Sequence, residues 1–268
     1  MASFIIRLFW NTLRKFWSDS GTHMAAGLAY FALLSMFPFT LGLLAILGYC
    51  LPLANVQEEI LDALKNLLLL PPELIERNVS KIIEFRNALG LVSIILLLWA
   101  ISGVFGALNR SMNQVWNVQR DRKFLIRKFR DILMALFAGS LLLISIEANS
   151  LFPILRSLGI VEASIVLDIA GKLLSMLFVG IAFTLIYKFV PNEKIRWKYI
   201  WPGAIFGIVL FDAAKSLFVL YLAHFANYEM IYGSIASVIA FLVWIYYSAI
   251  ILIMGAELNS EYARMTEK

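Results

Sequence analysis

Apolar runs of about twenty residues recur along the chain, and this feature restricts its fold more than any other. The run at 201–222 reads WPGAIFGIVLFDAAKSLFVLYL, which is long enough to cross a bilayer as one helix. Hydrophobic residues make up 61% of the chain and charged residues only 15%. Soluble domains have roughly 45–50% and 25%. The sequence therefore predicts an integral membrane protein with several spans.

We expect an all-α fold in which a single transmembrane domain, 1–268, contains six helices. The predicted spans are, in order, 24–50, 88–108, 131–152, 168–189, 201–222 and 232–258. Gly203 and Gly207 are four residues apart, a spacing that favours close contact with another helix. After 258 the composition becomes polar, and we expect a tail outside the membrane.

Two segments outside the spans have amphipathic patterns. Residues 1–23 place apolar side chains at helical spacing, together with Arg7, Arg14 and Lys15. This pattern is typical of a helix that lies at the membrane interface. Residues 51–87 are too polar to cross, and we expect them to form a short helical cap on the extracytoplasmic side.

The distribution of positive charge predicts the topology. Seven bases and a single acid, Asp121, lie between Asn109 and Arg130. Short loops rich in Lys and Arg remain in the cytoplasm, so this loop is expected there. The loop with Lys194 and Arg196 follows the same rule, and six spans then place both termini in the cytoplasm.

Four stretches of the sequence resemble the YihY family, also called the virulence factor BrkB-like family and once labelled ribonuclease BN. They are MAAGLAYFALLSMFPF at 24–39, ALNRSMNQVWNV at 107–118, VPNEKIRWKYIWPGAIFGIVLFDAAKS at 190–216 and YEMIYGSIASVIAFLVWIYYSAIILIMGAELNSEY at 228–262. The resemblance covers nearly the whole chain. It implies a six-span protein of the bacterial inner membrane, with a role in lipid or envelope-related transport.

Charged and polar residues at membrane depth form the candidate substrate-binding or coupling site. Asp212 and Lys215 are three residues apart and share one face of a helix. Charges at this depth face a partner, the protein interior or a water-filled cavity. We expect Glu147, Asn149 and Lys172 to line the same cavity from neighbouring spans. The alternative is a set of structural ion pairs that hold the helices together.

A second polar group lies where the span 88–108 meets the basic loop. The residues expected to contact anionic lipid or its headgroups are Asn109, Arg110, Asn113, Arg120, Arg122 and Lys123. The alternative is that these residues end the helix and supply the topology signal.

These patterns favour transport or facilitated movement of an amphipathic or lipid-like solute, with membrane lipids as partners. The alternative function is a non-transporting membrane scaffold or an assembly partner of an envelope complex. Cys50 is the single cysteine, and His23 and His224 are the two histidines, on opposite sides of the predicted membrane. The sequence has no paired-His motif, Cys cluster or phosphate-binding glycine loop. We therefore expect no enzymatic activity, metal, cofactor or nucleic-acid partner.

Overall fold

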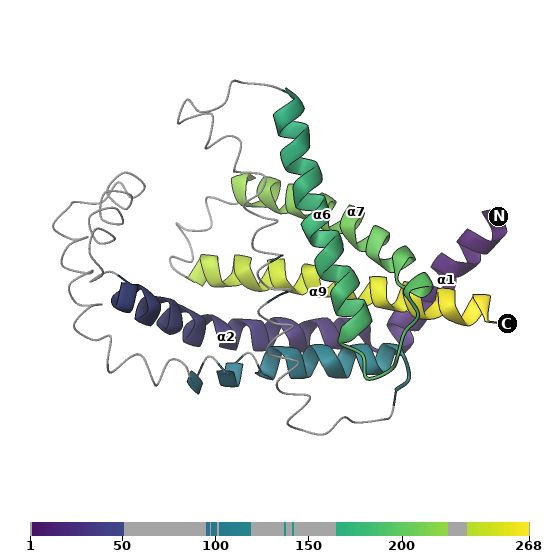
Figure 1. The fold of residues 1–268 in the computed structure, drawn as a ribbon, viewed down its shortest axis with the longest axis horizontal. Coiled ribbons are helices and arrows are strands. Elements are labelled where there is room, and N and C mark those ends of the chain that lie inside the picture. Colours follow the sequence, from purple (N-terminus) through teal and green to yellow (C-terminus); the bar gives the residue numbers. More distant parts are fainter. Residues whose placement is uncertain are drawn as a thin grey trace. The chain divides into compact units, whose positions relative to one another are not determined.

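The computed structural model describes residues 2–50, 95–96, 98–100, 102–118, 137, 141, 165–224 and 235–267, and the regular structure in these ranges is helical (Figure 1). The elements are α1 (Ala2–Ser18), α2 (Gly21–Cys50), α6 (Ile165–Phe189), the 3-10 helix η1 (Trp197–Tyr199), α7 (Trp201–His224) and α9 (Ile235–Thr266). Residues 102–115 form a further helical segment. The predicted all-α class is confirmed for these ranges.

Three helices in the described ranges are long and apolar enough to cross a membrane. The candidate spans are Ile169–Phe189, Trp197–Tyr221 and Val238–Thr266. They correspond to the predicted spans 168–189, 201–222 and 232–258, while α2 covers the predicted span 24–50. Part of 88–108, nearly all of 131–152 and the whole cap 51–87 lie outside the described residues. The number of six spans stays a prediction.

The chain divides into two compact units, one made of Met1–Tyr30 with Val104–Lys268 and the other of Phe31–Gly103. In the second unit, a Cβ built on Gly103 would lie 2.9 Å from Cδ1 of Phe31, so the glycine admits the aromatic ring at close range. The contacts described below belong to the first unit. A single domain over 1–268 stays a prediction.

In the first unit, α7 packs against both α6 and α9 (Figure 1). Gly207 faces α6, where a Cβ would overlap the ring of Phe183. Gly203 faces α9, where a Cβ would overlap the carbonyl oxygen of Gly255. The spacing of Gly203 and Gly207 predicted close helix contact, and the structure shows that the two glycines approach two different helices.

The outward faces of these helices are apolar. Ile169, Leu173 and Leu177 follow one another at four-residue spacing on α6, and all three are exposed. Ile205 and Val209 are exposed with the same spacing on α7. A helix on the surface of a soluble protein places polar residues on its outer face. Extended apolar faces of this kind indicate contact with lipid.

Helix α9 continues to Thr266, beyond the predicted end of the last span at 258. That span end and the polar tail stay predictions. The polar side chains in this region are enclosed by the protein. Glu257, Asn259 and Glu261 are 0%, 0% and 1% exposed, in the part of α9 that packs against α1 and α7.

Helix α1 has two different apolar faces. Leu8, Thr12 and Phe16 follow one another at four-residue spacing and are buried, while α1 packs against α9. Trp10 and Trp17 lie on another face and are 69% and 64% exposed. A helix that buries one face against the protein and exposes aromatic side chains on another is suited to the membrane interface. That location of α1 stays a prediction.

Candidate functional site

Asp212 lies between two ammonium groups. It is near the middle of α7, about 16 Å from Trp201 at 1.5 Å per residue. Its Oδ1 lies 3.5 Å from Nζ of Lys215, one turn further along the same helix. Its Oδ2 lies 3.5 Å from Nζ of Lys172 on α6. The structure therefore brings together three of the five residues of the predicted binding or coupling site.

Ser175 of α6 fixes the position of Lys215. The Lys215 ammonium donates a hydrogen bond of 2.8 Å to Oγ of Ser175, which is fully buried. The side chains of Lys215 and Asp212 are 14% and 18% exposed, while that of Lys172 is 62% exposed. Among the described residues, the cluster has two ammonium groups and one carboxylate, and the more accessible cation is Lys172. This arrangement can attract an anionic group.

The other two members of that predicted site, Glu147 and Asn149, lie outside the described residues. Their place in the site stays a prediction. We call Lys172, Ser175, Asp212 and Lys215 the α6–α7 cluster.

The asparagines of the predicted headgroup set make contacts within the protein. Asn109 is buried, and its Nδ2 donates to the carbonyl oxygen of Val190 at 2.6 Å. Asn113 donates from Nδ2 to Oδ1 of Asn109 at 3.0 Å, and its own Oδ1 accepts the backbone N–H of Asn192 at 2.8 Å. These bonds tie the segment 102–115 to the loop after α6. Arg110 is exposed, and the remaining members of the set, Arg120, Arg122 and Lys123, lie outside the described residues.

The segment 102–115 ends in a turn that leaves one carbonyl group for another element. Asn117 has φ 52°, and the N–H of Val118 bonds to the carbonyl of Asn113 at 2.8 Å. This is the Schellman pattern, in which a left-handed residue closes a helix. The carbonyl of Val115 accepts Nζ of Lys15 at 2.5 Å. A cation at the C-terminus of a helix also interacts favourably with the helix dipole.

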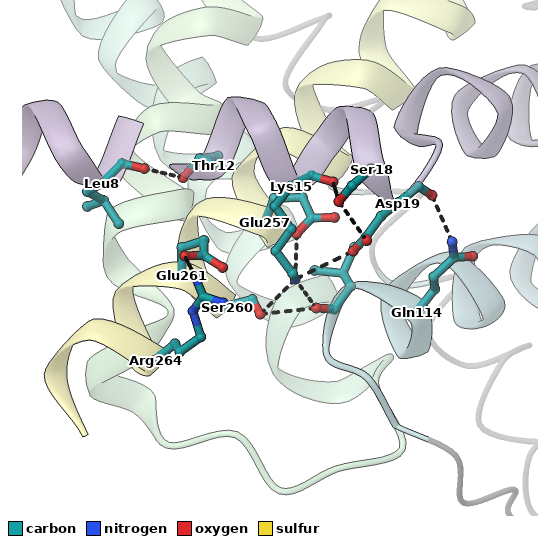
Figure 2. A network of polar contacts seen from close by, with 11 residues as sticks. Leu8, Thr12, Lys15, Ser18, Asp19, Gln114, Glu257, Ser260, Glu261 and Arg264 are labelled. Carbon is teal, nitrogen blue, oxygen red and sulfur yellow. Dashed lines mark hydrogen bonds and ion pairs between the residues drawn. The ribbon is translucent and has the colours of Figure 1, made fainter. Parts of the chain in front are cut away.

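Lys15 also connects α1 to the end of α9. Its Nζ donates to Oε2 of Glu257 at 2.7 Å and to Oγ of Ser260 at 3.1 Å, and Figure 2 shows the ammonium at the centre of these contacts. Nζ lies 3.7 Å from Oδ2 of Asp19. We call the group of six residues the α1–α9 junction: Lys15, Asp19, Gln114, Val115, Glu257 and Ser260.

This junction was not predicted from the sequence. The available signal was GAELNSE at 255–261, in which two acids and an amide directly follow a long apolar run. Such residues belong either to a solvated tail or to a buried helix end, and Lys15, the partner of Glu257, is 242 positions away.

Two pockets flank α1. A polar pocket of about 440 Å³ is lined by residues that include Arg14, Lys15, Asp19, Glu261 and Arg264. An apolar pocket of about 450 Å³ lies between α1, α7 and α9, and its lining includes Ile5, Phe9, Leu13, Phe206, Met254 and Leu258. In the part of the chain that the structure describes, no three His, Cys, Asp or Glu side chains are grouped as a metal site requires.

Helices with apolar outer faces and enclosed charged groups between them define a multi-pass membrane protein. Residues 12–268 match the family model of virulence factor BrkB, and the chain belongs to this family. The resemblance predicted from the four sequence stretches is confirmed.

The relatives are bacterial proteins. The chain is 30% identical to the ribonuclease-like protein YfkH of Bacillus subtilis, over 96% of this chain and 94% of that protein. It is 30% identical to a UPF0761 membrane protein of Azotobacter vinelandii, over 93% of this chain but only 62% of that protein. It is 28% identical to a UPF0761 membrane protein of Pseudoalteromonas atlantica, over 96% and 85%. No solved structure matches the chain.

Proposed function

We propose that the protein moves, or helps to move, an amphipathic or lipid-like solute with an anionic head across the bacterial inner membrane. One observation carries this proposal. Among the described residues, Lys172, Asp212 and Lys215 carry a net positive charge between two candidate membrane spans. Charges at this depth are costly and mark substrate pathways more often than surface charges do.

The geometry of the α6–α7 cluster suits a reversible contact with an anion. Both nitrogen–oxygen distances around Asp212 are 3.5 Å, longer than the roughly 2.7–2.9 Å of a tight charge-assisted hydrogen bond. Lys172 lies about 10 Å along α6 from Ile165 and is largely exposed. A solute anion can therefore compete with Asp212 for this ammonium, while Ser175 keeps Lys215 in place.

The apolar pocket beside α1 supports the lipid-like part of the proposal. Its lining is contributed by the exposed apolar face of α1 and by the adjoining parts of α7 and α9. A volume of about 450 Å³ is within the range of ligand pockets and can take part of an alkyl chain. With both termini in the cytoplasm, as the charge distribution predicts, this pocket would open to the inner leaflet.

Native mass spectrometry of the full chain, purified in a mild detergent, tests the proposal through its bound lipids. We expect the parent protein to retain anionic lipid and Lys172→Met to lose most of it, because the accessible cation is removed. Lys194→Met removes an exposed lysine from the loop after α6 and should leave lipid retention unchanged. Equal retention of anionic lipid by the parent and Lys172→Met would contradict the proposal.

A second function, a membrane scaffold without transport, is favoured by a different observation. Several buried polar groups have partners within the protein, as in the bonds of Asn109 to Val190 and of Lys215 to Ser175. Polar pairs between membrane helices can simply hold a bundle together. A protein of this kind would keep its cellular activity when the charges at 212 and 215 are removed together and the fold is retained.

We do not propose a nuclease, although the name of the Bacillus relative includes the term ribonuclease-like. Cleavage of RNA needs a general acid and base or metal ligands on a face that reaches water. Among the residues that the structure describes, no three His, Cys, Asp or Glu side chains are grouped in this way. We propose that the chain has no enzymatic activity of its own.

A further inference from the structure

We propose that the α1–α9 junction is a binding site for one proton, which the carboxyl groups of Asp19 and Glu257 share. The proposal rests on the hydrogen bonds, burial and charges of the junction and is independent of the transport function proposed above.

All three protons of the Lys15 ammonium are already used. A lysine ammonium has three N–H donors. They reach the carbonyl of Val115 at 2.5 Å, Oε2 of Glu257 at 2.7 Å and Oγ of Ser260 at 3.1 Å. Oδ2 of Asp19 lies 3.7 Å from the same nitrogen, too far for a fourth hydrogen bond. Lys15 therefore leaves part of each carboxylate without a donor.

The two oxygens without a donor belong to different carboxyl groups. Oε1 of Glu257 and Oδ2 of Asp19 are buried, and neither has a hydrogen-bond partner in the described part of the chain. The side chain of Glu257 is fully enclosed. Both carboxyl groups lie beside the same Lys15 ammonium, with Oε2 of Glu257 at 2.7 Å and Oδ2 of Asp19 at 3.7 Å from Nζ (Figure 2). A proton on one group would become a donor to the other, so that a single proton satisfies both.

The local charge balance also favours a bound proton. The junction contains one ammonium and two carboxylates, and two carboxylates that share a site do not both ionise readily. The segment 102–118 contributes only the Val115 carbonyl and the side-chain amide of Gln114, which donates to the backbone oxygen of Asp19 at 2.7 Å. Among the described residues, the other charged side chains around the adjoining polar pocket are Arg14, Glu261 and Arg264. Glu261 pairs with Arg264 at 2.7 Å, and Arg14 is exposed.

The polar pocket provides a route for the proton. Lys15 and Asp19 line this pocket of about 440 Å³, whereas Glu257 lies behind them. The Asp19 side chain is 23% exposed, so water in the pocket can reach the junction. Asp19 directly follows α1 and Glu257 belongs to α9. Loss of the proton places two like charges between these helices, and the contact of α1 with α9 weakens.

Infrared spectroscopy of the full chain in detergent at neutral pH tests this site, because a protonated carboxyl group has its own C=O band. We expect a carboxylic-acid band in the parent that disappears at alkaline pH and is absent in both Asp19→Asn and Glu257→Gln. Each variant keeps the shape of the side chain and replaces the shared proton with an amide donor. Glu261→Gln alters a neighbouring buried carboxylate outside the pair and should leave the band unchanged.

Proton uptake provides a second measurement that does not depend on assigning a band. When the protein is brought from alkaline to neutral pH, the parent should take up one proton more per chain than the double variant Asp19→Asn/Glu257→Gln. A carboxylic-acid band that survives in both single variants would overturn the proposal. So would equal proton uptake by the parent and the double variant, or occupation of the junction by Na⁺ or K⁺ in place of the proton.

Discussion

Nζ of Lys15 lies 2.7 Å from Oε2 of Glu257, although 242 positions separate the two residues. The contact joins α1 to the end of α9, and the Glu257 side chain is fully enclosed. The same ammonium also closes the C-terminus of the segment 102–115 through the carbonyl of Val115. One side chain thus connects three helical segments that are distant in the sequence.

Removal of Lys15 alone should strongly destabilise the protein. Breaking a buried ion pair leaves an uncompensated charge and typically costs about 3–5 kcal/mol. Lys15→Met should therefore show this loss in the free energy of unfolding in detergent, and Lys15→Met/Glu257→Gln should recover much of it. Arg14→Met removes the exposed neighbouring charge and should have little effect. Equal stability of Lys15→Met and the parent would show that the junction is not a buried pair.

A methyl group at Gly203 should disturb the contact between α7 and α9. The new Cβ would overlap the carbonyl oxygen of Gly255, and the backbone N–H of Gly203 donates to Oδ1 of Asn259 at 2.7 Å. Overpacking of this kind typically costs about 1–3 kcal/mol. Gly203→Ala should therefore lower the thermal midpoint in detergent. Gly27→Ala is the matched control, because a Cβ there meets no atom within 4 Å. A parent-like midpoint for Gly203→Ala would mean that the two helices are further apart.

The sequence was informative where a structural feature depends on neighbouring residues. The apolar runs predicted α6 and α7 at 168–189 and 201–222, and the helices are Ile165–Phe189 and Trp201–His224. The three-residue spacing of Asp212 and Lys215 indicated their contact, because a helix brings such positions together regardless of the rest of the fold.

The sequence was less informative where a feature depends on packing between distant segments. Polar residues at the end of α9 were predicted to form a tail, since composition alone does not show that α1 covers them. The contact between Lys172 and Asp212 needed the relative position of α6 and α7. The partner of Glu257 could not be chosen among the many lysines and arginines of the chain without the fold.

The topology can be tested by reporter fusions at four positions. Fusions after Gln119 and Asn192 should report the cytoplasm, because these positions lie in or beside the basic loops. Fusions after Glu73 and Ser157 should report the extracytoplasmic side. An extracytoplasmic signal at Gln119 would exclude the six-span arrangement with both termini in the cytoplasm.

The two lysines of the α6–α7 cluster should differ in their effect on stability. Lys215 is 14% exposed and donates a hydrogen bond to the buried Ser175, so Lys215→Met removes an enclosed charged hydrogen bond and should cost about 1.5–3 kcal/mol. Lys172 is 62% exposed, and Lys172→Met should cost about 0–1 kcal/mol. Unfolding in detergent measures both values. Equal losses in the two variants would mean that the enclosure of Lys215 has no energetic consequence.

The double variant Asp212→Asn/Lys215→Met separates a structural role from a functional one. Replacing both members of a buried pair is often nearly neutral for stability. We therefore expect this variant to be more stable than Lys215→Met and close to the parent. If the double variant is no more stable than Lys215→Met, the two residues do not compensate each other.

The most direct test of the proposed function is the rate at which a headgroup-labelled anionic lipid crosses the bilayer of proteoliposomes that contain the purified full chain. We expect the parent and the control Lys194→Met to accelerate this movement. We expect Asp212→Asn/Lys215→Met, folded and present at equal amounts, to return the rate to that of protein-free liposomes. Movement by the double variant at the parent rate would contradict a role of the α6–α7 cluster in transport, and so would a parent protein that gives no acceleration.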